Sequence, residues 1–153
     1  MLQLTKRTEY GLIAMVHLAS RAGEVVSVRE ICEHYPIPRR LVAEVLKELG
    51  RAELVESHRG ASGGYALTRE PEHIALSEVV AALEGAPGLT SCQADWGDPR
   101  RDGGHAAECG VQATCPIRSP IHRIREHLWG LMQRTTLRSL TSSAPLALES
   151  THS

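Results

Sequence analysis

The stretch LVESHRGASGGYAL, residues 54–67, holds two short segments with the spacing of extended strands, Leu54 to Ser57 and Tyr65 to Leu67, around a centre that contains Gly60, Gly63 and Gly64. Such segments favour β-strands, and glycines between them allow the backbone angles of a wide turn. We therefore expect a β-hairpin over residues 54–68, with Arg59 and Gly60 at its tip.

The chain just before this hairpin, SVREICEHYPIPRRLVAEVLKELG at residues 27–50, predicts two short helices joined by a tight turn. Ser27 and Glu30 have the spacing of a capping box at the start of the first helix, and Pro36 and Pro38 end it. The second helix has one apolar face, made of Leu41, Val45, Leu46 and Leu49. This pattern is typical of a helix-turn-helix and also of an ordinary helical hairpin. The β-hairpin that follows at once favours the first, because a helix-turn-helix followed by such a hairpin is a winged helix.

Two further helices are expected on either side of this unit. Residues 4–23 have apolar residues at helical spacing and end in a glycine. Residues 75–86, ALSEVVAALEGA, form a shorter helix that we expect Ser77 to cap and Gly85 to stop.

A long helix is expected over residues 119–141, with Ser119 as its cap and Pro120 at its first position. One apolar stripe runs along it, made of Ile121, Ile124, Leu128, Leu131 and Leu137. A long helix with one apolar stripe on so small a domain needs a partner surface that covers the stripe. We therefore expect this helix to be a dimerisation helix. The alternative is that the stripe packs on the core of its own chain.

Composition limits the class of protein. The chain has 153 residues, 42% of them hydrophobic and 23% charged, which favours one globular domain over residues 1–142 with a flexible tail at 143–153. The formal net charge of −1 gives no overall basic excess, and the 3% aromatic content argues against a surface for single strands or RNA. No signal peptide or membrane span is apparent, so we expect a cytoplasmic protein without a membrane partner.

The loop at residues 91–116 contains Cys92, Cys109 and Cys115 among Gly, Asp, Arg and Ala. A loop so poor in apolar residues cannot gain order by burial, so a metal that binds the thiolates is a natural source of order. Three thiolates leave open an iron–sulfur cluster, a zinc site completed by His105 or His122, and unliganded thiols. The fourth cysteine, Cys32 in the first helix of the helix-turn-helix, is expected to be a small core residue.

The order of these segments resembles one known family. Along the chain stand LTKRTEYGL, the helix-turn-helix, the wing HRGASGGYAL, LSEVVAALEG, the three-cysteine loop and a long helix that ends in TLRSL. This arrangement, from about residue 2 to 141, is similar to the Rrf-two (BadM-type) bacterial iron–sulfur winged-helix transcription regulators, with their IscR-like and NsrR-like members. The R-G-x-x-G-G-Y-x-L wing is the most specific part. The resemblance implies a homodimer that binds double-stranded DNA and holds a 2Fe–2S or 4Fe–4S cluster.

By position, the resemblance implies that Cys92, Cys109 and Cys115 are the cluster ligands. Sixteen residues separate the first two, more than the family usually shows. IscR-like members have a histidine ligand three residues after the last cysteine, where this chain has Arg118, which cannot bind iron. NsrR-like members use an acidic residue of the partner's first helix, and the matching residue is Glu9. The alternative for Glu9 is a solvated carboxylate on the helix face.

These observations predict a mostly α protein with a small β-hairpin wing, acting as a transcription regulator and not as an enzyme. Arg39 and Arg40 would contact bases or phosphates in the major groove, Arg59 the minor groove, and Tyr10 the backbone. The regulator, expected to be a repressor, would bind a palindromic site under control of a cluster that senses nitric oxide, redox state or the supply of iron or clusters. It would have no small-molecule substrate. The rival hypotheses are a winged-helix adaptor with a structural zinc or a thiol switch, and a thiol enzyme, for which no Cys-His-acid arrangement is apparent.

Overall fold

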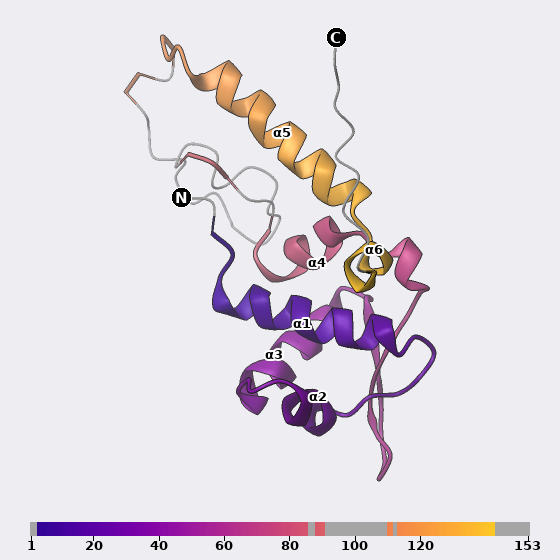
Figure 1. Ribbon diagram of the computed structural model, residues 1–153. Coiled ribbons are helices and arrows are strands. Elements are labelled where there is room, and N and C mark those ends of the chain that lie inside the picture. Colours follow the sequence, from indigo (N-terminus) through magenta and orange to yellow (C-terminus); the bar gives the residue numbers. More distant parts are fainter. Residues whose placement is uncertain (1–2, 86–87, 91–109, 112, 143–153) are drawn as a thin grey trace.

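The computed structural model describes residues 3–85, 88–90, 110–111 and 113–142 (Figure 1). Its helices are α1 (Lys6–Ser20), α2 (Val28–His34), α3 (Arg39–Arg51), a short 3₁₀ turn η1 (Pro71–His73), α4 (Leu76–Leu83), α5 (Arg118–Arg134) and α6 (Leu137–Thr141). Its two strands, β1 (Val55–His58) and β2 (Gly64–Leu67), form one antiparallel hairpin. The expected mostly α fold with a winged helix-turn-helix is confirmed. The expected tail at 143–153 lies outside the described residues.

Helices α1 to α4 surround one apolar core. The fully buried side chains include Met15 and Leu18 of α1, Ile31 of α2, Leu46 and Leu49 of α3, and Val79 of α4. The helix starts are set locally, since the side chain of Thr5 accepts from the N–H of Thr8 and that of Ser27 from the N–H of Glu30.

The wing owes its shape to glycines that leave no room for a side chain. A Cβ atom on Gly64 would lie 2.2 Å from the carbonyl oxygen of Val26, and one on Gly63 would lie 2.5 Å from that of His58. The close approach at Gly64 lets Val26 pair with Tyr65 as an isolated β-bridge beside the hairpin. The glycine pair of the wing signature therefore ties the hairpin to the loop that precedes α2.

Two details of the expected helices are wrong. Ser77 does not cap α4, because it is the second residue of that helix and is buried; instead, Glu78 accepts the backbone N–H of Ala75 at 2.8 Å. Helix α5 likewise begins at Arg118 after Ile117, so Ser119 is not its cap.

The expected helix over 119–141 is two helices, and this correction changes the role of Leu137. The chain leaves the helical conformation at Thr135 and Thr136, where the N–H of Leu76 donates to the carbonyl of Thr135 at 2.7 Å. The N–H of Leu137 donates to the carbonyl of Ile74 at 3.0 Å, and its side chain is fully buried in the core. These backbone contacts break the helix, and the end of the stripe packs on its own chain.

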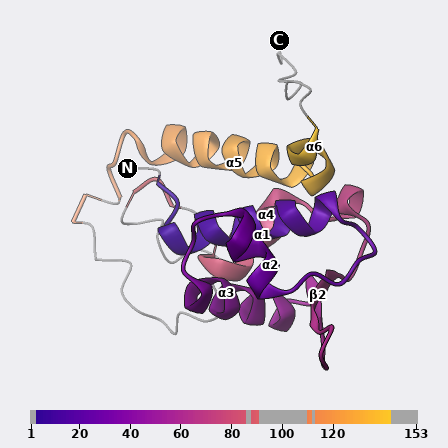
Figure 2. The same cartoon turned by 60° about the horizontal axis from the view of Figure 1, so that its bottom comes forward.

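Helix α5 and the wing lie at opposite sides of the molecule. In both views α5 runs along one edge, while α3 and the tip of the hairpin occupy the other (Figures 1 and 2). No residue of α5 is buried, and Ile124 is 50% exposed. Among the described residues, no helix is long and apolar enough to cross a membrane.

Candidate nucleic-acid interface and cysteine site

Helix α3 has one buried face and one charged face. The buried residues are Val42, Val45, Leu46 and Leu49, whose spacing follows the helical period. The opposite, exposed face carries Arg39, Arg40, Ala43, Glu44, Lys47 and Arg51. Four basic side chains therefore share this surface with one carboxylate, although the whole chain has a formal charge of −1.

Ion pairing separates the lysine and arginine side chains of residues 3–85 into two groups. Those that pair with a carboxylate are Lys6, Arg7, Arg21, Arg29, Arg40 and Arg69. Those that have no ion-pair partner in the described structure are Arg39, Lys47 and Arg51 of α3 and Arg59 of the wing. Pairing leaves little net charge at the first group, so the uncompensated positive charge of this region lies on α3 and the wing.

Arg39 and Arg40 are the first two residues of α3, as the sequence predicted for the start of this helix. The guanidinium of Arg40 is 3.0 Å from the carboxylate of Glu44, one turn later, and the Arg40 side chain is 89% exposed. Such an exposed pair exchanges readily for another anion, because solvent screens it. Both arginines are therefore accessible to an incoming polyanion.

Arg59 directly follows β1 and is exposed at the tip of the wing. The next residue, Gly60, has φ +109°, a conformation that favours glycine. The Arg59 side chain is therefore accessible to solvent at this turn.

Tyr10 lies on α1 and is half-buried, and no hydrogen bond or ion pair in the described structure joins it to the three arginines. Helix α1 is nevertheless fixed against α3. Arg7 forms an ion pair with Glu48 of α3, and a Cβ atom on Gly11 would be 3.9 Å from Val45. A Cβ there would also come within 2.4 Å of Leu83 of α4, so glycine allows the three helices to approach closely.

The expected cluster ligands are only partly described. Cys92, Cys109 and the alternative ligand His105 lie outside the described residues. Cys115 is half-buried in the segment that leads into α5. Glu9 lies in the first turn of α1, where its carboxylate is 2.6 Å from the amine of Lys6. Among the residues that the structure describes, no three acidic, histidine or cysteine side chains gather into a metal site.

The other residues considered for this site lie in described helices. Arg118 is the exposed first residue of α5. The alternative ligand His122 is 3.1 Å from Glu126, one turn further along α5. Cys32 is half-buried and packs against the core, and burial raises the pKa of its thiol, with Arg39 acting in the opposite direction. This contact with the core agrees with the structural role expected for Cys32.

The chain that leads toward the cysteine loop is fixed to the start of α1. The carboxylate of Glu84, just after α4, accepts from the backbone N–H of Thr5 at 2.7 Å and from its hydroxyl at 2.6 Å. Burial raises the pKa of Glu84, but hydrogen bonds from Thr5 and Thr8 outweigh it, so the pKa lies below its ordinary value. Glu84 therefore lies beside the start of the helix that carries Glu9.

Two basic residues of this surface, Lys47 and Arg51, were not among the expected binding residues. They follow Arg39 at steps of eight and twelve residues, which places all three on one side of a helix. This spacing is visible in the sequence. That Lys47 and Arg51 have no ion-pair partner among the described residues, unlike most of the other cations, is visible only in the structure.

The chain matches the Rrf2 family, described as iron-dependent transcriptional regulators, over residues 4–143. It is 34% identical over 92 residues to the HTH-type transcriptional regulator NsrR of Bacillus licheniformis, covering 60% of this chain and 64% of that protein. It is 37% identical over 83 residues to BadM of Rhodopseudomonas palustris, covering 54% of this chain and 53% of that protein. The aligned part is thus less than two thirds of the length of either relative.

A solved structure of a bacterial regulator has the same fold as this chain. CymR (YrzC), the global cysteine regulator of B. subtilis, superposes with a TM-score of 0.70 at 27% identity, covering 95% of this chain and all of that one. The family match spans every described helix and the wing. The chain therefore belongs to the Rrf2 family, whose members are transcriptional regulators rather than enzymes.

Proposed function

We propose that the protein is a homodimeric transcription regulator that binds double-stranded DNA under the control of an iron–sulfur cluster. The observation that carries DNA binding is the gathering of unpaired cations on α3 and the wing. Contacts with phosphates supply most of the affinity of a protein for DNA, and the first residues of a recognition helix contact base edges. Arg39 and Arg40 stand at that end of α3, whereas Arg59 at the wing tip suits a narrow minor groove.

Helix α5 is the proposed dimer contact. Its apolar stripe of Ile121, Ile124, Leu128 and Leu131 has no fully buried member in the single chain. A second copy would remove this surface from water, which is favourable by roughly 25 cal/mol per Å². Two-fold symmetry then implies a palindromic DNA site. Such a regulator acts where the DNA is, which in bacteria is the cytoplasm.

The donor set fits an iron–sulfur cluster in its chemistry. Cys92, Cys109 and Cys115 offer thiolates, and these clusters accept a different ligand in place of a thiolate. Glu9 of the partner subunit would supply a carboxylate once it leaves Lys6, whose exposed ion pair is weak. When bound, the cluster would supply a centre that reacts with nitric oxide or oxidants and depends on the iron supply.

The packing of α1 gives a route from this site to the DNA-binding surface. Glu9 and Arg7 lie in the first two turns of α1, and Arg7 is ion-paired with Glu48 of α3. Gly11 of the same helix lies against Val45. A shift of α1 when Glu9 changes partner would therefore act on the orientation of α3.

The visible absorption spectrum of protein purified without oxygen tests the cluster. We expect a brown protein whose chromophore is lost when Cys92, Cys109 or Cys115 is replaced by serine. Cys32→Ser is the matched control and should keep the chromophore, because Cys32 packs against the core. Glu9→Ala should still assemble a cluster, but with an altered spectrum and faster loss in nitric oxide or air.

DNA affinity measured on the same samples separates the proposal from its rivals. Loss of the chromophore should change the affinity for a selected palindromic duplex. A colourless wild-type protein that contains zinc, or one whose affinity follows thiol oxidation alone, would contradict the cluster and support the zinc or thiol-switch alternative. CymR is described as a cysteine regulator, which is a reason to test for regulation that does not depend on a cluster. Unchanged spectra and decay in Glu9→Ala would exclude Glu9 as a ligand.

A further inference from the structure

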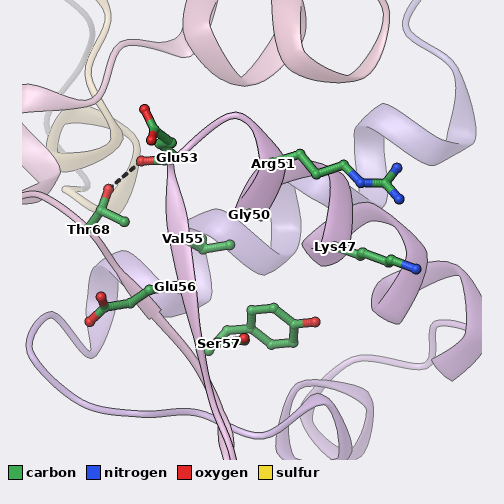
Figure 3. Close-up of a pocket in the computed structure, with 9 residues that line it drawn as sticks. Lys47, Gly50, Arg51, Glu53, Val55, Glu56, Ser57 and Thr68 are labelled. Carbon is green, nitrogen blue, oxygen red and sulfur yellow. Dashed lines mark hydrogen bonds between the residues drawn. The ribbon is translucent and has the colours of Figure 1, made fainter.

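An open groove of about 500 Å³ lies between the C-terminal half of α3 and the base of the wing (Figure 3). Its shape follows from the way α3 ends. The N–H of Leu54 donates to the carbonyl of Leu49 at 3.0 Å, and Glu53 adopts φ +60°, which turns the chain so that β1 begins at Val55. Gly50 adds no side chain at the point where α3 faces β1.

The charged side chains of the groove divide by sign. Lys47 and Arg51 extend from α3 to one side of β1, whereas Glu53 and Glu56 extend to the other (Figure 3). Strand alternation explains the position of Glu56, since successive side chains of β1 point to opposite faces and Val55 is buried against α3. The carboxylate of Glu56 is also 3.1 Å from the ring of His58, on the same face of β1.

The side of the groove that faces α3 therefore carries positively charged side chains, and neither carboxylate of the groove lies on that side. Lys47 and Arg51 are exposed and have no ion-pair partner in the described parts of the chain. Ser57 lies on the same face of β1 as Val55, and its exposed hydroxyl adds a further donor. The hydroxyl of Thr68 is already used, because it donates to the carbonyl of Glu53 at 2.6 Å.

We propose that this groove binds the DNA backbone, with Lys47 and Arg51 contacting phosphates. The inference rests on the proposed DNA-binding function and divides α3 into two parts. Arg39 and Arg40 at its start would contact base edges, while its C-terminal half anchors the helix independently of sequence. Lys47 and Arg51 are one helical turn apart, about 6 Å of rise, and one DNA strand offers a phosphate about every 3.4 Å of duplex axis. The two cations can thus serve different phosphates.

The salt dependence of binding to random-sequence duplex DNA measures these contacts, and no operator needs to be known. Each phosphate contact adds about 0.9 to the slope of log K against log [salt]. Lys47→Ala and Arg51→Ala should each lower that slope by about 0.9 per bound chain, and the loss of affinity should be equal on every sequence. Lys47→Arg and Arg51→Lys should retain the wild-type slope, because they keep the charge.

Arg138→Ala is the matched control, since it removes the same charge from α6, where Arg138 is paired with Glu72. It should leave the slope unchanged. If wild-type protein binds duplex DNA but the two groove variants keep its slope, the groove is not a phosphate site although the proposed function stands. If they lose affinity on one sequence only, the cations contact bases and the inference is wrong. If wild-type protein shows no salt-dependent binding to any duplex, the proposed function itself fails.

Discussion

Replacing Leu137 by alanine should destabilise the single chain, whereas the same change at Leu131 should mainly weaken the dimer. Both residues belong to one apolar stripe in the sequence. In the structure Leu137 is fully buried, while Leu131 is half-buried on α5, a helix with no buried residue. The two variants therefore remove the same atoms from two different environments.

The magnitudes follow from these environments. A fully buried leucine replaced by alanine costs about 3–5 kcal/mol, because the lost contacts and the remaining cavity add. For a domain of this size that lowers the Tm by roughly 6–20 °C. Leu131→Ala should cost about 1 kcal/mol or less in the free energy of unfolding of the monomer, since part of its side chain already contacts water.

Denaturant unfolding at protein concentrations that differ by 100-fold distinguishes the two effects. The destabilisation by Leu137→Ala should be the same at both concentrations. That by Leu131→Ala should depend on concentration, because it acts through association, and sedimentation should show a weaker dimer. Leu128→Asp combined with Leu131→Asp should give monomers. An equal and concentration-independent loss in both alanine variants would refute the division of the stripe between core and dimer contact.

Three further predictions concern the DNA contacts, a buried histidine and the end of α3. Arg59→Ala should weaken binding most at sites with A·T-rich flanks, whereas Arg40→Ala should reduce discrimination within the half-sites. Competition binding on sequence libraries measures both effects. Equal losses of affinity on all sequences would mean that Arg59 and Arg40 both contact phosphates instead. Burial, and then the neighbouring His34, lower the pKa of His17, so the unfolded chain binds protons more readily. Stability should therefore fall as the pH drops below the ordinary histidine pKa of about 6.5. His17→Leu should make the denaturation midpoint depend less on pH. Gly50→Ala should raise the free energy of unfolding by about 0.5–1 kcal/mol, because its Cβ meets only ordinary contacts 3.7 Å away; a lower denaturation midpoint would contradict that packing.

The sequence by itself determined the elements whose signals are local. The cap at Ser27, the buried period of α3 and the glycines of the wing act within a few residues, so the helix-turn-helix and the hairpin were predicted within about three residues. The candidate DNA contacts followed from these elements. The proposed cluster ligands came instead from the resemblance to the family, and two of the three cysteines lie outside the described residues.

Only the tertiary structure decided how the last helix ends and where positive charge remains. The break at Thr135 depends on Leu76, distant in sequence, because a backbone pairing across the fold competes successfully with continuation of the helix. In the same way, the carboxylate that pairs with Arg138 belongs to Glu72, 66 residues away. The net charge of −1 therefore gives no indication of the basic surface. Whether a cation has an ion-pair partner depends on its neighbours in space and not on its neighbours in sequence.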